Sequence, residues 1–416
     1  MRIKISKPGT IELQVIFELL ICIFYTWYFL PISQALLWQY KTIMFGLFAA
    51  GTVALAFLND IRLTKILIPI LAYMLLLTVL SLCKVDDASK HIRVSFTFWG
   101  TALLYFGVLD DKGRIRIGKY LLVLFFVTAV TSALGVMIDN NAARTIARAA
   151  ADEELQNGYK LKNISGIYLF QGLVLFVPLL VCIPKKPWTK TICWMVLIAI
   201  LMVLISASFT ISLIVFVFSL LLSLMFKESK KTKMGQVGQF IFLCLVVVLL
   251  LNGSSILQYL GNNIKNHKVA TRMLELRQLI YFGESQGDAA LRVNSYTISL
   301  ETFLRNPFGV GAHYSYDVGS NGLGYHSKIL DDLARFGIFA LAFYAVFFVS
   351  YYKHLKAAWT RAGYPRIAIF VVVTWILFLL LNIGFRSADE SIVMLFLMPV
   401  IPLLVNSRNE NEKKEG

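Results

Sequence analysis

The chain has 416 residues, of which 58% are hydrophobic, and its formal net charge is +16 at pH 7. A mean hydropathy of +0.70 excludes an ordinary soluble protein of two or three domains. The composition instead indicates that the lipid bilayer is the solvent, where helices of about 20 apolar residues satisfy the backbone polar groups.

Apolar segments of that length recur along the chain and predict an all-α polytopic membrane protein with about 12 transmembrane helices. Nine lie within residues 1–252 and three within 333–405, while a charged tail, 406–416, is expected to be disordered. The expected spans are residues 11–30, 42–58, 66–83, 92–109, 117–138, 164–183, 189–206, 209–226, 236–252, 333–351, 367–384 and 390–405.

The positions of the basic residues decide between a nucleic-acid-binding protein and a membrane topology. With the N-terminus inside, the cytoplasmic segments carry 23 Lys and Arg. This asymmetry follows the positive-inside rule, so we expect both termini in the cytoplasm, residues 253–332 outside the membrane, and no nucleic-acid partner. The short loops on the opposite side carry only Lys41, Lys84, Lys90, Arg93 and Arg386.

The large outer segment, residues 253–332, has the pattern of a folded region. Apolar residues from Val269 to Ile280 repeat at helical spacing and predict an amphipathic helix at the membrane interface. A second helix is expected next, which ends at Asn306-Pro307 because the residue before proline avoids the α conformation. Glycines follow, and a backbone rich in glycine can approach a ligand closely. Tyrosines among them suit either stacking on sugar rings or a place at the membrane interface; they are Tyr314, Tyr316 and Tyr325.

Four features in this segment occur in a fixed order. Arg292 opens the second helix, residues 306–311 read Asn-Pro-Phe-Gly-Val-Gly, the pair His326-Ser327 follows, and residues 336–338 read Phe-Gly-Ile. In order and spacing they resemble the O-antigen polymerase and O-antigen ligase superfamily of bacterial membrane glycosyltransferases. A weaker match is Asn163, which opens an Asn-Ile-Ser-Gly sequence at the start of the sixth span.

The resemblance implies a donor glycan carried on undecaprenyl diphosphate and passed to an acceptor hydroxyl, with the lipid diphosphate as leaving group. It implies no cofactor, nucleotide sugar or metal. Where the family commonly has a Ser-Arg pair at the start of the eighth span, this chain has Ser208-Phe209, without the arginine. That departure favours a capsule or exopolysaccharide polymerase over a ligase.

A departing diphosphate develops negative charge, which guanidinium groups can bind in a bidentate manner. Arg292 and Arg386 are the candidates we favour, with Arg305 and Arg335 behind them. Arg386 could equally be a residue whose side chain extends to the membrane interface. Arg305 lies four residues after Glu301 on the same helix, and this spacing favours a solvated ion pair between the two.

The attacking hydroxyl benefits from a base, and an imidazole suits that role near neutral pH. His326 is the candidate base, the alternative being a loop histidine bonded to a backbone carbonyl. Asp331 and Asp332 are adjacent on a helix and point in different directions, so joint metal binding is not expected. We expect Asp331 to cap the tenth span instead.

The sequence thus predicts a polymerase that joins lipid-linked oligosaccharide units on the outer face of a bacterial cytoplasmic membrane. Its partners would be the undecaprenyl-diphosphate-linked oligosaccharide, membrane lipid, a chain-length regulator and a flippase. One alternative is an O-antigen ligase that passes the finished glycan to a lipid or cell-wall acceptor. Another is a transporter of the lipid-linked glycan, but such proteins often carry charges midway through their spans.

Overall fold

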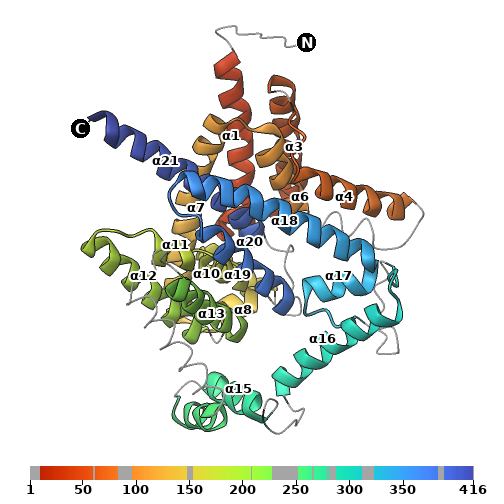
Figure 1. Ribbon diagram of the computed structural model, residues 1–416, viewed down its shortest axis with the longest axis vertical. Coiled ribbons are helices and arrows are strands. Elements are labelled where there is room, and N and C mark those ends of the chain that lie inside the picture. Colours follow the sequence, from red (N-terminus) through yellow and green to blue (C-terminus); the bar gives the residue numbers. More distant parts are fainter. Residues whose placement is uncertain are drawn as a thin grey trace. The chain divides into compact units, whose positions relative to one another are not determined.

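The computed structural model describes residues 10–59, 61–82, 96–147, 153–207, 209–226, 252–264, 267–278, 281, 287–311, 323–382 and 388–415. Within these ranges the chain is helical and contains no strand, as Figure 1 shows. The expected all-α class is therefore confirmed for the residues described.

Apolar helices occur where the sequence predicts membrane spans. Among the described residues, four are long and apolar enough to cross a membrane: Pro31–Leu58, Asp111–Ile138, Pro187–Ser206 and Ile338–Arg361. Seven shorter apolar helices coincide with further expected spans: Leu13–Phe29, Leu67–Val79, Phe96–Val108, Ile167–Cys182, Thr210–Phe226, Ile367–Leu381 and Glu390–Asn406. Residues 236–251 of the ninth expected span lie outside the described residues. The chain is thus a polytopic helical membrane protein, and the number of 12 spans stays a prediction.

The chain divides into two compact units. The first contains Met1–Ala72, Val94–Gly172 and Ser387–Gly416, and the second contains Tyr73–Arg93 and Leu173–Arg386. Helices α4 (Leu67–Leu82) and α10 (Ile167–Val174) contribute residues to both.

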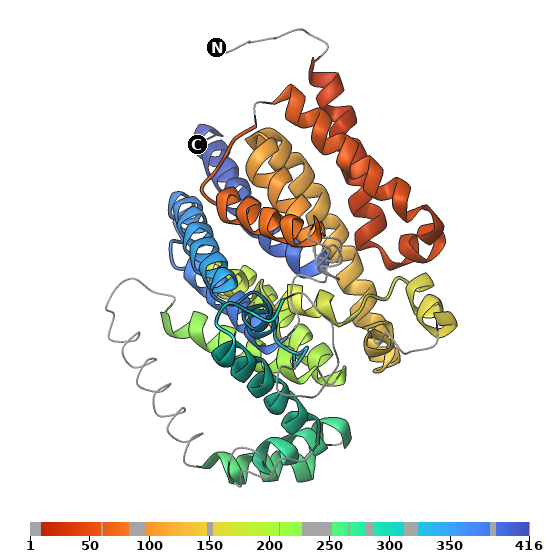
Figure 2. The same ribbon diagram turned by 90° about the vertical axis from the view of Figure 1, so that its right-hand side faces the viewer.

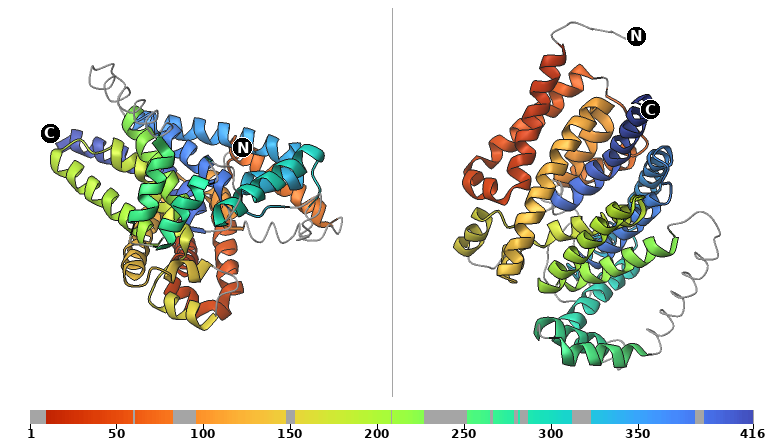
Figure 3. Two further views of the ribbon diagram at one scale, coloured as in Figure 1. Left: turned by 90° about the horizontal axis from the view of Figure 1, so that it is seen from below. Right: turned by 90° about the vertical axis from the view of Figure 1, so that its left-hand side faces the viewer.

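In the first unit, α1 lies beside α3, the two helices drawn in red in Figure 2, and also contacts the long helix α7 (Figure 3). Two π-helical turns, η2 and η4, pack together through the rings of Tyr105 and Phe396, whose centroids are 4.9 Å apart. The elements of this unit are α1 (Thr10–Phe29), α2 (Pro31–Leu37), η1 (Trp38–Tyr40), α3 (Lys41–Leu58), α6 (Phe96–Leu103), η2 (Leu104–Val108), α7 (Asp111–Ile138), α8 (Ala142–Ala147), α9 (Glu153–Leu161), α20 (Ala388–Ile392), η4 (Val393–Leu397) and α21 (Met398–Glu415).

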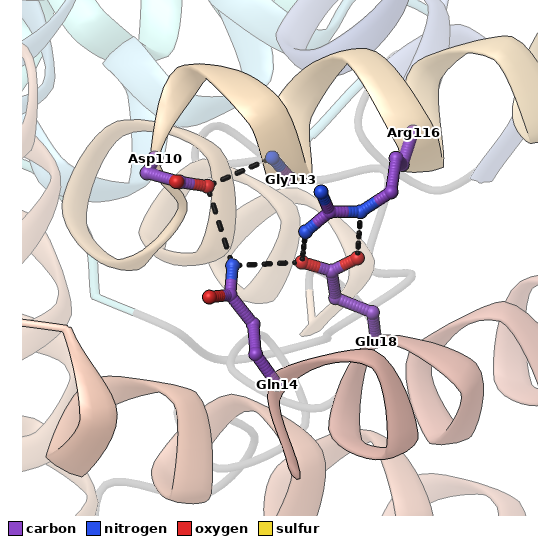
Figure 4. Close-up of polar contacts among 5 residues, drawn as sticks. All are labelled: Gln14, Glu18, Asp110, Gly113 and Arg116. Atoms are coloured by element: carbon purple, nitrogen blue, oxygen red, sulfur yellow. Dashed lines mark hydrogen bonds and ion pairs between the residues drawn. The ribbon is translucent and has the colours of Figure 1, made fainter. Parts of the chain in front are cut away.

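A charged pair joins α1 to α7 inside this unit (Figure 4). The Arg116 guanidinium donates two hydrogen bonds, of 2.7 and 2.5 Å, to the carboxylate of Glu18, which is 5% exposed. The Gln14 amide donates to the same carboxylate at 3.0 Å and to Asp110 at 3.3 Å. Asp110 in turn caps α7 by accepting from the Gly113 N–H at 2.8 Å. A charge that the sequence places within an expected span is therefore fully hydrogen-bonded.

In the second unit, helices α18 and α19 form an aromatic core. Trp375 lies 5.5 Å from Tyr351 and 5.8 Å from Phe347, measured between ring centroids. Helix α17 packs on α16, α18 and α19. The elements are α11 (Val177–Cys182), α12 (Pro187–Ser206), α13 (Thr210–Phe226), a helix over residues 252–263, α15 (His267–Arg277), α16 (Gly287–Arg305), α17 (Lys328–Phe336), α18 (Ile338–Arg361) and α19 (Ile367–Leu381).

Three expected elements differ in the structure. The tenth span begins at Ile338, not at residue 333, because Gly337 has φ +58° and breaks the helix there. The sixth span is two helices, α10 and α11, since a new helix begins at Val177, with Pro178 in its first turn, in the middle of the apolar segment. The charged tail continues α21 as far as Glu415, so the expectation of disorder is wrong: its Glu and Lys residues favour helix.

Candidate active site

One face of α16 carries three polar residues at helical spacing: Arg292, Tyr296 and Ser299. The Tyr296 hydroxyl donates to the Leu381 carbonyl at 2.8 Å, and the Ser299 hydroxyl donates to Asp331 at 2.6 Å. Burial raises the pKa of Tyr296, and the neighbouring Arg292 guanidinium opposes part of that rise. Ser299 of this face therefore contacts α17, and Tyr296 contacts the end of α19.

Arg292 is half-buried, and one of its nitrogen atoms, Nη1, is fully buried. Nη1 has no hydrogen-bond partner among the described residues. A guanidinium without its full set of acceptors is expensive to bury, so an anionic ligand is a physically reasonable partner for this nitrogen.

The turn at residues 306–311 fastens the end of α16 to the end of α17. The Val310 N–H donates to the Ala334 carbonyl at 3.0 Å, and the Gly311 N–H donates to Arg335 at 2.9 Å. Gly309 has φ +88°, and a Cβ there would overlap the Arg335 carbonyl. Gly309 is thus needed for close backbone contact, while Gly311, with φ +91°, is needed for its backbone conformation.

The segment 323–327 carries the candidate base and is held from both sides. On one side, the Gly324 N–H donates to the Ser299 hydroxyl at 2.8 Å, and the Tyr325 N–H donates to Asp331 Oδ1 at 3.2 Å. On the other side, Ser327 caps α17 by accepting from the Leu330 N–H at 3.1 Å. His326, which is half-buried, lies between these fixed points.

Asp331 is not the helix cap that the sequence suggested. Ser327 occupies the cap, and Asp331 lies one turn into α17, where it is 5% exposed and joined to α16. Burial raises its pKa above the ordinary value of 3.8, the Ser299 hydrogen bond and the nearby Arg335 acting in the opposite direction. The interpretation failed because a carboxylate in the first turn of a helix usually serves that helix, and its partner is 32 residues away.

Asp332 forms a second buried cluster, which the sequence did not predict. Its carboxylate, 1% exposed, pairs with Lys328 and accepts a hydrogen bond of 2.7 Å from the Tyr344 hydroxyl. The Tyr73 hydroxyl lies 3.5 Å away. Adjacent carboxylates thus serve different partners, as their directions on the helix require.

The structure brings some of the predicted binding residues together. The Arg335 guanidinium lies 5.5 Å from the centre of the Tyr325 ring, a cation–π contact, and Tyr325 has φ +59°. Arg305 instead pairs with the exposed carboxylate of Glu301 at 3.3 Å, which is the alternative that the spacing allowed. Arg386, Tyr314 and Tyr316 lie outside the described residues.

Asn163 belongs to the first unit and is bonded within it. Its side-chain nitrogen donates to the Thr131 hydroxyl at 3.0 Å, and its φ of +56° suits a turn. Its side-chain oxygen accepts a long hydrogen bond of 3.4 Å from the Ile32 N–H. A role of Asn163 in binding substrate stays a prediction.

No group of three or more His, Cys, Asp or Glu side chains that could hold a metal ion occurs among the described residues.

These features define a membrane protein with a polar site built on α16, α17 and the segment between them. A family model described as O-antigen ligase matches residues 194–345, from α12 into α18. The match includes Arg292, the 306–311 turn and His326, and it confirms that the chain is related to the O-antigen ligase and polymerase superfamily. Over residues 194–345, which are less than half of the chain, the protein is therefore similar to the O-antigen ligase family. The comparison with curated proteins gave no match.

Proposed function

We propose that this protein is a polysaccharide polymerase of the bacterial cytoplasmic membrane. It joins oligosaccharide units carried on undecaprenyl diphosphate at the outer face, with both termini in the cytoplasm. The positive-inside asymmetry of the loops supports this orientation. The observation that carries the proposal is the buried Nη1 of Arg292, which has no hydrogen-bond partner among the described residues and lies on the helix face that contacts the segment bearing His326.

In the proposed reaction, an acceptor sugar hydroxyl attacks the anomeric carbon of the donor glycan. His326 removes the hydroxyl proton, a new glycosidic C–O bond forms, and the bond from the anomeric carbon to the diphosphate breaks. The lipid diphosphate leaves with the bonding electrons, and Arg292 binds the charge that develops on it. Tyr325 lies in the segment 323–327, next to His326, and forms a cation–π pair with Arg335. Both residues are candidate glycan contacts.

An O-antigen ligase is the second candidate, because the matching family model carries that description. The two functions share the donor and the leaving group and differ in the acceptor. A ligase passes glycan once to a lipid or cell-wall acceptor, whereas a polymerase uses a second lipid-linked oligosaccharide.

Purified protein in vesicles, supplied only with a lipid-diphosphate oligosaccharide, tests this choice. A polymerase gives a ladder of products that differ by one repeat unit, with one lipid diphosphate released per bond. A ligase leaves the donor unchanged until a lipid acceptor is added and then gives a single addition. Movement of intact donor across the bilayer without new bonds would contradict both and identify a transporter.

A further inference from the structure

A single hydrogen-bond network connects α16, α17 and the backbone next to His326. Oδ1 of Asp331 accepts from the Ser299 hydroxyl at 2.6 Å and from the Tyr325 N–H at 3.2 Å. The Ser299 oxygen also accepts from the Gly324 N–H at 2.8 Å. Two consecutive peptide N–H groups of the segment therefore end on this serine and this carboxylate.

The segment is in a conformation that needs such support. Tyr325 has φ +59°, a left-handed backbone conformation that is unfavourable for a residue with a side chain. A Cβ at Gly324 would overlap the Ser295 backbone, so the segment is pressed directly against α16. Strained backbone persists only where the surrounding structure fixes it.

The opposite end of the segment is also fixed. The Lys328 N–H donates to the Asn382 carbonyl at 3.0 Å, and Ser327 caps α17. His326 thus lies between an anchor on α19 and the Ser299–Asp331 network on α16 and α17. Loss of the network would remove its two hydrogen bonds from one end of the segment, while the Ser327 cap remains.

We propose that Asp331, acting through Oδ1 and the Ser299 hydroxyl, is a positioning residue that fixes His326 for proton transfer. This inference rests on the proposed function in assigning the base to His326. Burying a carboxylate is costly, and an apolar pair of the same size would join two helices at least as well. An apolar pair, however, cannot accept hydrogen bonds from the Gly324 and Tyr325 N–H groups.

The test compares Ser299→Ala, Asp331→Ala and Asp331→Asn in the full chain. Asn keeps an oxygen that can accept both hydrogen bonds, so it should restore the function that Ala loses. The matched control is Ser223→Ala on α13, which removes a buried hydroxyl bonded to the Ser219 carbonyl at 2.7 Å, outside the network. Thermal unfolding of each variant verifies folding.

The first measurement is the NMR titration of the histidine rings, labelled at Cε1, of which the chain has 5. We expect Ser299→Ala to shift the His326 signal and its titration midpoint, and Ser223→Ala to leave both unchanged. Because this readout needs no glycan transfer, it decides the positioning role even if the proposed function fails.

The second measurement is the transfer reaction. With His326 displaced, kcat should fall by about 100-fold while KM changes little. Asp331→Asn should recover most of that loss. The inference is overturned if Ser299→Ala folds like the control and leaves both the His326 titration and kcat as in the control.

Discussion

The hydroxyl of Ser299 on α16 lies 2.6 Å from Oδ1 of Asp331 on α17, and both side chains are buried. A carboxylate held in this way stays in a low-dielectric environment, where its charged form is disfavoured. The pair therefore has a consequence for how the stability of the protein depends on pH.

Burial raises the pKa of Asp331 in the folded protein above its ordinary value. Between the two values the folded state binds more protons than the unfolded state. The contribution of this group to stability is complete below the unfolded pKa and is lost as the pH rises through the folded pKa. We expect the unfolding temperature of the native protein to fall relative to that of Asp331→Asn as pH rises from about 4. A difference between the two proteins that is constant with pH would contradict this prediction.

The turn at residues 306–311 allows a test of backbone crowding. Gly309 and Gly311 have similar φ values, +88° and +91°, so alanine is strained by about 1–2 kcal/mol at either position. Only at Gly309 does the added Cβ overlap the Arg335 carbonyl, since Gly311 has open space. Gly309→Ala should lower the unfolding temperature clearly more than Gly311→Ala. Equal decreases in the unfolding temperature of the two variants would show that the turn is not in close contact with α17.

The pair of Arg116 and Glu18 links α1 to α7. Arg116→Ala leaves a buried carboxylate without its charged donors, which should cost about 1.5–3 kcal/mol of unfolding free energy. Glu18→Gln should cost less, because it removes the buried charge together with the ion pair. Unfolding in detergent measures both changes.

Asp111→Asn is the control for that measurement. It breaks the pair of Asp111 with Arg114, in which the carboxylate is 70% exposed, and should cost less than about 1 kcal/mol. If Arg116→Ala costs no more than this control, the Glu18 pair does not stabilise the first unit.

The apolar helices could be predicted from the sequence because the length of an apolar segment follows directly from the thickness of the bilayer. The end of α16 at Asn306-Pro307 was also predictable, since proline restricts the residue before it. The breaks at Gly337 and after Phe176 were missed, because long apolar segments mask a local turn or a new helix start. Residue spacing alone does not reveal a positive φ.

The candidate site was only partly predictable. Arg292 and His326 were recognised from the motif, and their roles stay predictions. The Ser299–Asp331 bond was missed because it joins residues 32 apart on different helices, which no helical spacing reveals. Its one signal in the sequence was an unusual pair of adjacent acidic residues at the start of an apolar helix. The hydrogen bonds of Asp332 were also missed, because two of its partners, Tyr344 and Tyr73, lie on other helices, within apolar sequence.

The most direct test is glycan transfer in vesicles supplied with a lipid-diphosphate oligosaccharide. His326→Ala and Arg292→Ala are compared with Arg361→Ala, which removes an exposed arginine at the end of α18. Both site variants should lose at least about 100-fold in the rate of product formation, while Arg361→Ala should keep the native rate. Native rates in both His326→Ala and Arg292→Ala would contradict the roles proposed for these residues.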